Sequence, residues 1–211
     1  MSKLAHILAV EIAKPDFTGF ARVDPIAKIS EGNLWIGPRP HLEELDPDLT
    51  ESDKAILQLI PYVVVRYNGN VLAYVRPNKG NEARLHGKVS VGLGGHVDLA
   101  DAVHEDSVVN IDATLRESCV RELFEEVSIT VDPQDIQWSG LIYRRDGPVD
   151  RVHLRVHLGV VAEIEADEAM HKSICSSEET GKIRFTNPST ITTDMAEYEI
   201  EAWTKAVLEL D

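Results

Sequence analysis

Two apolar runs with a polar turn between them form the clearest pattern in the chain. The runs span Tyr62–Tyr67 and Val71–Val75, are rich in β-branched residues, and are separated by Asn68-Gly69-Asn70. Such residues favour a pleated strand, and Asn-Gly is typical of a tight hairpin turn. We therefore predict a β-hairpin, followed after a polar loop by a short strand over Lys88–Gly92 that leads to Gly94-Gly95.

A long amphipathic helix is predicted next. Asp112 is a good N-cap residue because its carboxylate can accept hydrogen bonds from the first N–H groups of a helix. The spacing beyond it places six apolar side chains on one helical face. These are Leu115, Cys119, Val120, Leu123, Phe124 and Val127.

Weaker patterns flank this central part. We expect a strand over His6–Ile12, then a short helix that is capped near Thr50 or Ser52 and stops at Pro61. Later in the chain, Trp138–Arg144 and Val152–Ile164 are predicted strands and Asp194–Leu210 is a predicted closing helix.

These elements indicate the fold class and the domain organisation. Strands with two well-separated helices favour an α+β or mixed α/β sandwich over a doubly wound parallel sheet. Residues 1–60 hold too few apolar side chains to fold alone. We therefore expect an N-terminal extension, residues 1–60, packed on a main domain of residues 61–211.

Composition and charge narrow the function classes. The 211 residues include 21 Lys and Arg against 36 Asp and Glu, a formal charge of −15. Proteins bind nucleic-acid polymers through Lys and Arg side chains that neutralise phosphates, so this excess of acidic residues argues against such a partner. The apolar stretch Leu4–Val10 is too short for a membrane span and does not have the form of a secretory signal. Cys119 and Cys175 indicate neither a disulfide framework nor a zinc site, and we expect a cytoplasmic location.

Three glutamates on the predicted helix carry the candidate chemistry. Glu122, Glu125 and Glu126 fall within an arc of about 100° on a helical wheel. Like charges this close repel, and a divalent cation such as Mg²⁺ or Mn²⁺, which prefers oxygen ligands, would relieve the repulsion. A solvated acidic helix face is the alternative. The surroundings favour the metal, because a strand delivers Gly94-Gly95, a loop follows, and a helix then carries Arg121-Glu-Leu-Phe-Glu-Glu126.

This arrangement resembles the Nudix hydrolase family, whose box reads G-x(5)-E-x(7)-R-E-U-x-E-E-x-G-U, where U is an aliphatic residue. Gly95 matches the first glycine, Arg121-Glu122-Leu123 and Glu125-Glu126 match the centre, and Ile129 matches the last aliphatic residue. The resemblance covers roughly Tyr62 to Leu210, and the segment Arg84–Asp98 is similar to a poorly characterised bacterial branch of the family. It implies a Nudix-like α/β/α sandwich with a mixed sheet.

The chain departs from the box at three places. Asp101 stands where the box has its first glutamate, so its carboxylate lies one methylene closer to the backbone. Arg121 follows Gly95 by 26 positions where the box has 14, which implies a 12-residue insertion that takes in residues 102–111. Ser128 replaces the last glycine, and a left-handed backbone there would cost a non-glycine residue about 1–2 kcal/mol. All three departures surround the glutamates rather than replace them.

The resemblance assigns roles to the matching residues. Glu122, Glu125 and Glu126 become ligands of Mg²⁺ or Mn²⁺, and one of the three serves as proton acceptor for the attacking water. Glu122, Glu125 and Arg121 are the candidate catalytic residues, with Arg121 orienting a glutamate through charge-assisted hydrogen bonds. The backbone carbonyl of Gly94 joins the metal shell, which the missing Cβ permits. Gly95 and Asp101 match the box without an assigned role.

Histidines form a second set of candidates. His153, Arg155 and His157 share one face of a predicted strand, and His96 follows the two glycines. All four could contact substrate phosphates, although a solvated sheet face or a dimer contact explains the strand pattern equally well. Glu178 or Glu179 lies where the family often draws an extra carboxylate, and an ordinary polar loop is the alternative.

We therefore expect a divalent-metal-dependent hydrolase that cleaves the diphosphate linkage of a small nucleoside diphosphate derivative. A Nudix-fold ligand-binding or regulatory module without catalysis is the main alternative. Isoprenoid diphosphate isomerisation on a similar fold ranks last, because it needs a reactive cysteine and neither cysteine is well placed for that. The resemblance also implies a homodimer.

Overall fold

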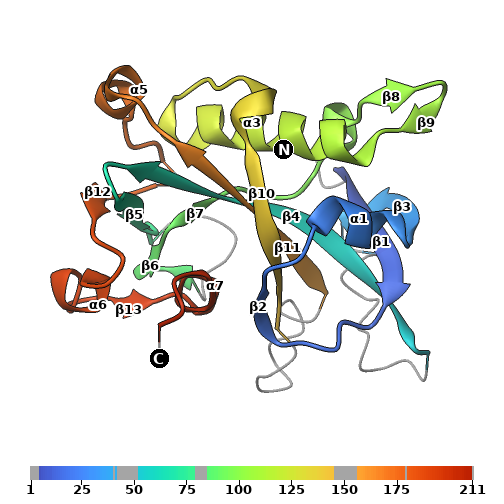
Figure 1. The fold of residues 1–211 in the computed structure, drawn as a ribbon, viewed down its shortest axis with the longest axis horizontal. Coiled ribbons are helices and arrows are strands. Elements are labelled where there is room, and N and C mark those ends of the chain that lie inside the picture. Colours follow the sequence, from blue (N-terminus) through green and yellow to red (C-terminus); the bar gives the residue numbers. More distant parts are fainter. Residues whose placement is uncertain are drawn as a thin grey trace. The chain divides into compact units, whose positions relative to one another are not determined.

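The computed structural model describes residues 5–39, 41, 52–78, 85–144, 156–178 and 180–210, whose course is shown in Figure 1. The chain divides into two compact units. Unit 1 comprises Met1–Pro61, Gly95–Ser118 and Trp138–Val161, and unit 2 comprises Tyr62–Gly94, Cys119–Gln137 and Ala162–Asp211. Strands β4 (Lys54–Tyr67) and β11 (His157–Glu165) and helix α3 (Ile111–Val127) each contribute residues to both units.

Unit 1 is built mainly on antiparallel strand pairs. Strand β1 (His6–Ala13) pairs with β3 (Asn33–Pro38) and with β4, and Val10 lies opposite Leu34 in the first pair and Leu57 in the second. Strand β2 (Gly19–Ala21) pairs with β10 (Gln137–Tyr143). The predicted strand at His6–Ile12 is confirmed by β1, and the one at Trp138–Arg144 by β10. The other elements of unit 1 are α1 (Pro25–Ser30), the 3₁₀ turn η3 (Leu99–Asp101), and the strands β8 (His104–Glu105) and β9 (Val108–Val109).

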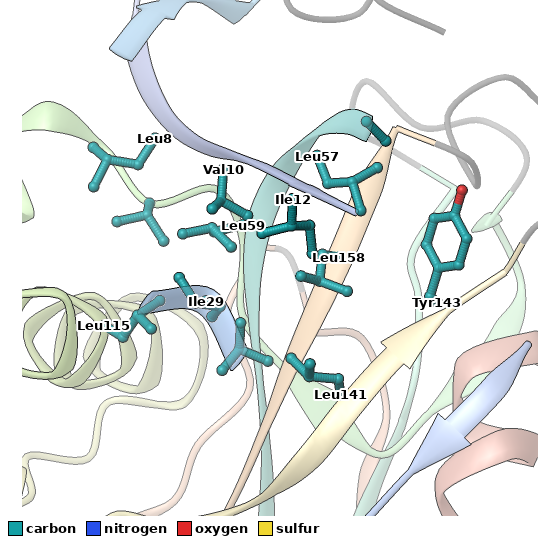
Figure 2. Packing of buried hydrophobic residues seen from close by; sticks show 13 residues of the cluster. Leu8, Val10, Ile12, Ile29, Leu57, Leu59, Leu115, Leu141, Tyr143 and Leu158 are labelled. Atoms are coloured by element: carbon teal, nitrogen blue, oxygen red, sulfur yellow. The ribbon is translucent and has the colours of Figure 1, made fainter. Parts of the chain in front are cut away.

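One hydrophobic cluster forms the core of unit 1 (Figure 2). Alternate residues of β1 and of β4 are buried in it, as expected for strands with one face on the core. Helices α1 and α3 and strands β10 and β11 complete it with one or two residues each. The labelled members are Leu8, Val10, Ile12, Ile29, Leu57, Leu59, Leu115, Leu141, Tyr143 and Leu158. Strands β1 and β4 and helix α1 therefore share this core with later residues of unit 1.

The short helix predicted to stop at Pro61 is wrong, because residues 54–61 form the first half of β4. Ala55, Leu57 and Leu59 are buried in the core cluster, whereas Ile56 packs in a separate small cluster. This alternation has the period of two of a strand. The pairing with β1, which is distant in sequence, decides the conformation here.

The 12-residue insertion contains a small hairpin. Strands β8 and β9 pair across Asp106-Ser107, and both turn residues have positive φ, of 47° and 68°. Two successive positive φ values are typical of the type I′ turn, whose twist suits a hairpin. The backbone N–H of Asn110 then donates to the carbonyl of Val103 at 2.8 Å and closes the base of the insertion.

Unit 2 contains the predicted hairpin. The second half of β4 pairs antiparallel with β5 (Asn70–Val75), with Arg66 opposite Val71. Strands β6 (Lys88–Ser90) and β12 (Ile183–Thr186) both pair with β5, and β7 (Gly92–Leu93) pairs with β4. Strand β13 (Glu199–Ile200) runs parallel to β6, so the sheet is mixed, as predicted. The unit also holds η4 (Pro133–Asp135), α5 (Glu168–Ser173), α6 (Ile191–Asp194) and α7 (Ala202–Val207).

The predicted closing helix over Asp194–Leu210 is wrong as a single element. Helix α6 ends at Asp194, whose carboxylate accepts hydrogen bonds of 2.7 Å from the hydroxyls of Thr186 and Thr190. Glu199 and Ile200 then pair with β6, and only the residues after Glu201 turn into α7. The parallel pairing with a distant strand interrupts the helical pattern.

Helix α3 confirms the predicted box helix, with two corrections. Its N-cap is Asn110 rather than Asp112, because Asn110 Oδ1 accepts a hydrogen bond of 3.0 Å from the backbone N–H of Ala113. Asp112 instead accepts a hydrogen bond of 2.6 Å from Trp138 Nε1. The second correction is Phe124, which is 59% exposed, although the other apolar positions such as Leu123 are buried or partly buried. In the described part of the chain, no helix combines the length and apolarity that a membrane crossing requires.

Candidate functional site

The three glutamates of the box lie on the second half of α3, within unit 2. Glu126 is 2% exposed and the Glu122 side chain is 9% exposed, whereas the Glu125 side chain is 56% exposed. An unpaired buried carboxylate is strongly unfavourable, so a folded protein pairs it with a cation or with hydrogen-bond donors. Two of the three candidate ligands therefore sit where a cation or hydrogen-bond donors must compensate a buried charge.

Arg121 supplies part of that compensation. One guanidinium nitrogen, Nη1, donates to Glu122 Oε1 at 2.7 Å and to Glu125 Oε2 at 3.0 Å. These are charge-assisted hydrogen bonds, which are shorter and stronger than bonds between neutral groups. The contacts are those expected if Arg121 orients a glutamate, and that role stays a prediction.

Gly94 lies directly beside Glu126. Its backbone N–H donates to Glu126 Oε2 at 3.0 Å, and its φ of 149° is one that residues with a side chain rarely adopt. The residue that follows strand β7 therefore contacts the helix that carries the glutamates. The position of Gly94 beside the glutamates is the one expected from the box, and the participation of its carbonyl in a metal shell stays a prediction.

The C-terminal end of α3 is held by a segment about 50 residues later in the chain, which contains Cys175 and Thr180. The Thr180 hydroxyl donates to the carbonyl of Glu126 at 2.8 Å, and the backbone N–H of Cys175 donates to the carbonyl of Val127 at 3.2 Å. The last carbonyls of a helix lack partners within it, so these two bonds complete the helix end. A buried threonine in a polar loop gives no sequence signal of such a role.

Ser128 takes the left-handed conformation that the box glycine would take. Its φ is 62°, and its N–H donates to the carbonyl of Phe124 at 3.0 Å. This bond is the one that characterises the αL form of helix C-cap. The helix exit is therefore the one expected of the box, formed by a residue that adopts it with strain.

In unit 1, two of the candidate histidines meet at one glutamine. Gln58 Oε1 accepts hydrogen bonds from His96 Nε2 at 2.9 Å and from His157 Nε2 at 3.2 Å, and the two imidazole centroids are 5.3 Å apart. A carbonyl oxygen only accepts, so both Nε2 atoms carry a proton. Gln58 is fully buried, and its polar side chain between Leu57 and Leu59 is the sequence signal that could have marked it.

The remaining candidates have separate positions. Asp101, in unit 1, is buried and its Oδ2 accepts a hydrogen bond of 2.9 Å from the backbone N–H of Asp98, so it shapes the turn after Gly95. His153, Arg155 and Glu179 lie outside the described residues. Glu178 is exposed. Of the two cysteines, Cys119 is buried and Cys175 is exposed.

The donor set of α3 suits a hard divalent cation. Mg²⁺ favours oxygen ligands and usually takes only one or two carboxylates, with water and phosphate completing its shell. Glu122 and Glu126, four residues apart and largely buried, offer such oxygens. Across the described residues, no group of three or more His, Cys, Asp or Glu side chains is close enough to form a ready-made metal centre.

Comparisons with known proteins bear on the fold. No family model matches the chain. Protein YmaB of Bacillus subtilis is 29% identical over 161 residues, which cover 76% of this chain and 73% of YmaB. The crystal structure of Tm1382, a proposed Nudix hydrolase, matches with a TM-score of 0.68 at 21% identity and covers 97% of this chain and 96% of Tm1382. Together with the mixed α+β architecture, this nearly complete match confirms the predicted resemblance at the level of structure: the chain has the Nudix fold.

Proposed function

We propose that this protein is a divalent-metal-dependent hydrolase that cleaves the diphosphate linkage of a small nucleoside diphosphate derivative. The observation that carries the proposal is the pair of largely buried carboxylates, Glu122 and Glu126, on the box helix of a Nudix fold. Buried acidic groups on one helix are unfavourable without a compensating cation. A phosphate substrate of a chain with a charge of −15 also needs such a cation.

The residues divide into three proposed roles. Glu122, Glu125 and Glu126 hold Mg²⁺ or Mn²⁺, and one of them accepts a proton from the attacking water. When bound, the cation stabilises the negative charge that develops on the phosphoryl oxygens. Arg121 fixes the side chains of Glu122 and Glu125 through its two hydrogen bonds. His96 and His157, together with His153 and Arg155, are proposed to contact the substrate.

A turnover screen tests the proposal. Dinucleotides, nucleotide sugars and nucleoside triphosphates are offered with and without Mg²⁺ or Mn²⁺, and nucleotide and phosphate release are measured. Glu122→Gln, Glu125→Gln and Glu126→Gln should each lower kcat by about 100-fold or more if the residue is a ligand or the base. Glu117→Gln, on an exposed position of the same helix, is the matched control and should keep full activity. Full metal-dependent turnover in all three box variants would contradict the assignment.

The same screen separates hydrolysis from the main alternative. A non-catalytic Nudix-fold module would bind a nucleotide and release no product with either metal, and its affinity would be measurable by calorimetry. A homodimer, a cytoplasmic location and a domain boundary near residue 60 remain predictions, and the first is tested by sedimentation of the purified chain.

A further inference from the structure

A second arginine of unit 2, Arg76, forms an ion pair that differs from an ordinary structural one. Arg76 directly follows β5, and its Cζ atom lies 5.5 Å from the centroid of the Tyr74 ring. Its ion-pair partner is Glu201, with Arg76 Nε and Glu201 Oε2 3.7 Å apart. The side chains of Arg76 and Glu201 are 22% and 9% exposed. A separation of 3.7 Å allows an ion pair but not a hydrogen bond.

One buried polar atom on each side of this ion pair makes no hydrogen bond within the described part of the protein. Arg76 Nε and Glu201 Oε2 are buried, and neither has a hydrogen-bond partner there. A guanidinium offers five N–H donors, and a buried donor without an acceptor is unfavourable. Arg66, in the same unit, shows the ordinary arrangement, because its Nε donates to Glu163 Oε2 at 2.5 Å. Arg76 is thus held by its ion pair while its Nε atom has no hydrogen-bond acceptor.

The charge of Arg76 acts close to one of the box glutamates, Glu126. Burial lowers the pKa of the Arg76 guanidinium, but the acidic groups of Tyr74, Glu201 and Glu126 outweigh it, and the net shift of the pKa is upward. The Tyr74 hydroxyl donates to the carbonyl of Gly92 at 2.9 Å, two residues before Gly94, whose N–H bonds to Glu126. The cation is therefore permanent and belongs to the same neighbourhood as Glu126.

We propose that Arg76 binds a phosphoryl oxygen of the diphosphate substrate, with Glu201 and the Tyr74 ring as positioning groups. The proposal rests on the proposed function for the nature of the substrate. A guanidinium matches the planar spacing of two phosphate oxygens and can donate to both at once. The Nε atom of Arg76 faces Glu201, so the proposed contact with the anion uses the terminal nitrogens Nη1 and Nη2.

Kinetics of five variants test this role on a substrate that the wild-type enzyme hydrolyses. Arg76→Gln should raise KM at least about 10-fold, and Arg76→Lys should raise it less, because an ammonium keeps the charge without the paired donors. Glu201→Gln should give a smaller rise, since the guanidinium stays but is held less firmly. Arg66→Gln, the matched control from the complete ion pair, should keep the wild-type KM. Millimolar guanidinium should restore part of the activity of Arg76→Ala, an effect that a structural role would not produce.

A binding measurement separates failure of this proposal from failure of the proposed function. Inorganic pyrophosphate is titrated by calorimetry into wild type, Arg76→Lys and Arg66→Gln without any turnover. If the wild-type enzyme hydrolyses no nucleoside diphosphate derivative, the proposed function fails, whereas a pyrophosphate Kd that weakens only in the Arg76 variant still supports the anion site. No binding by the wild type overturns the Arg76 proposal. A pyrophosphate Kd and a KM unchanged in Arg76→Lys, with a lowered unfolding temperature, also overturn it and leave Arg76 a structural residue.

Discussion

Restoring the box glycine at residue 128 should stabilise the protein. Ser128 sits at the C-cap of α3 with a φ of 62°. A left-handed conformation costs a residue with a Cβ about 1–2 kcal/mol, which Ser128→Gly removes. Glycine also gives the unfolded chain more conformational entropy, which lowers the free energy of unfolding by about 0.4–1 kcal/mol. The difference of these two ranges is about 0–1.6 kcal/mol, and its midpoint of about 0.8 kcal/mol corresponds to a rise in Tm of roughly 2–3 °C for a chain of this size.

Urea unfolding followed by circular dichroism measures this effect. The Ser128→Gly variant should show a higher midpoint with an unchanged m-value, because the surface exposed on unfolding is the same. Ser128→Ala is the control, since it keeps the Cβ and hence the strain, and should show no gain. A midpoint for Ser128→Gly at or below that of the wild type, or an equal gain in Ser128→Ala, would refute the argument that the left-handed residue stores strain.

Two further predictions concern the buried hydroxyls of unit 2. Thr204 Oγ1 forms a hydrogen bond with the Tyr62 hydroxyl at 2.9 Å and accepts one from the Val91 N–H at 3.1 Å. Thr204→Val removes both bonds and should lower the free energy of unfolding by about 2–4 kcal/mol. Tyr62→Phe should lower it by about 1 kcal/mol. Equal losses in urea titrations would show that the threonine is not the centre of this network. Burial raises the pKa of Tyr62 and of Tyr74 above the ordinary value of 10.0, so the unfolded chain loses these protons before the native protein does. Stability should therefore hold below pH 10 and fall as pH rises above it, and Tyr62→Phe should make that fall shallower in unfolding measured from pH 8 to 11. A fall of the same steepness in the variant would show that Tyr62 does not contribute.

The box helix could be predicted because its signals are local. The glutamates, Arg121 and the buried positions Leu115, Cys119 and Leu123 lie within a few turns, and their spacing is that of a helix. Local spacing also predicts the hairpin of β4 and β5, whose turn residues Asn68 and Gly69 both have positive φ.

The predictions that failed depend on pairing between distant residues. Pro61 reads as a helix stop, yet it lies inside β4, whose first half is fixed by β1. Glu199 and Ile200 carry no strand pattern of their own and become β13 through Lys88 and Val89. Part of the candidate site could not be predicted from the sequence for the same reason. Gln58 meets His157 only because the strands on which they lie are neighbours.

The hairpin within the insertion has a consequence for recognising distant relatives. It closes on itself where Asn110 bonds to Val103, and Asn110 also caps α3, so both ends of the inserted segment are fixed whatever lies between them. The number of residues between the first glycine of the box and its arginine is therefore free to vary in this fold without changing how α3 begins. A search pattern that fixes this number would pass over chains of this kind, whereas one anchored separately on Gly94-Gly95 and on the helix would retain them.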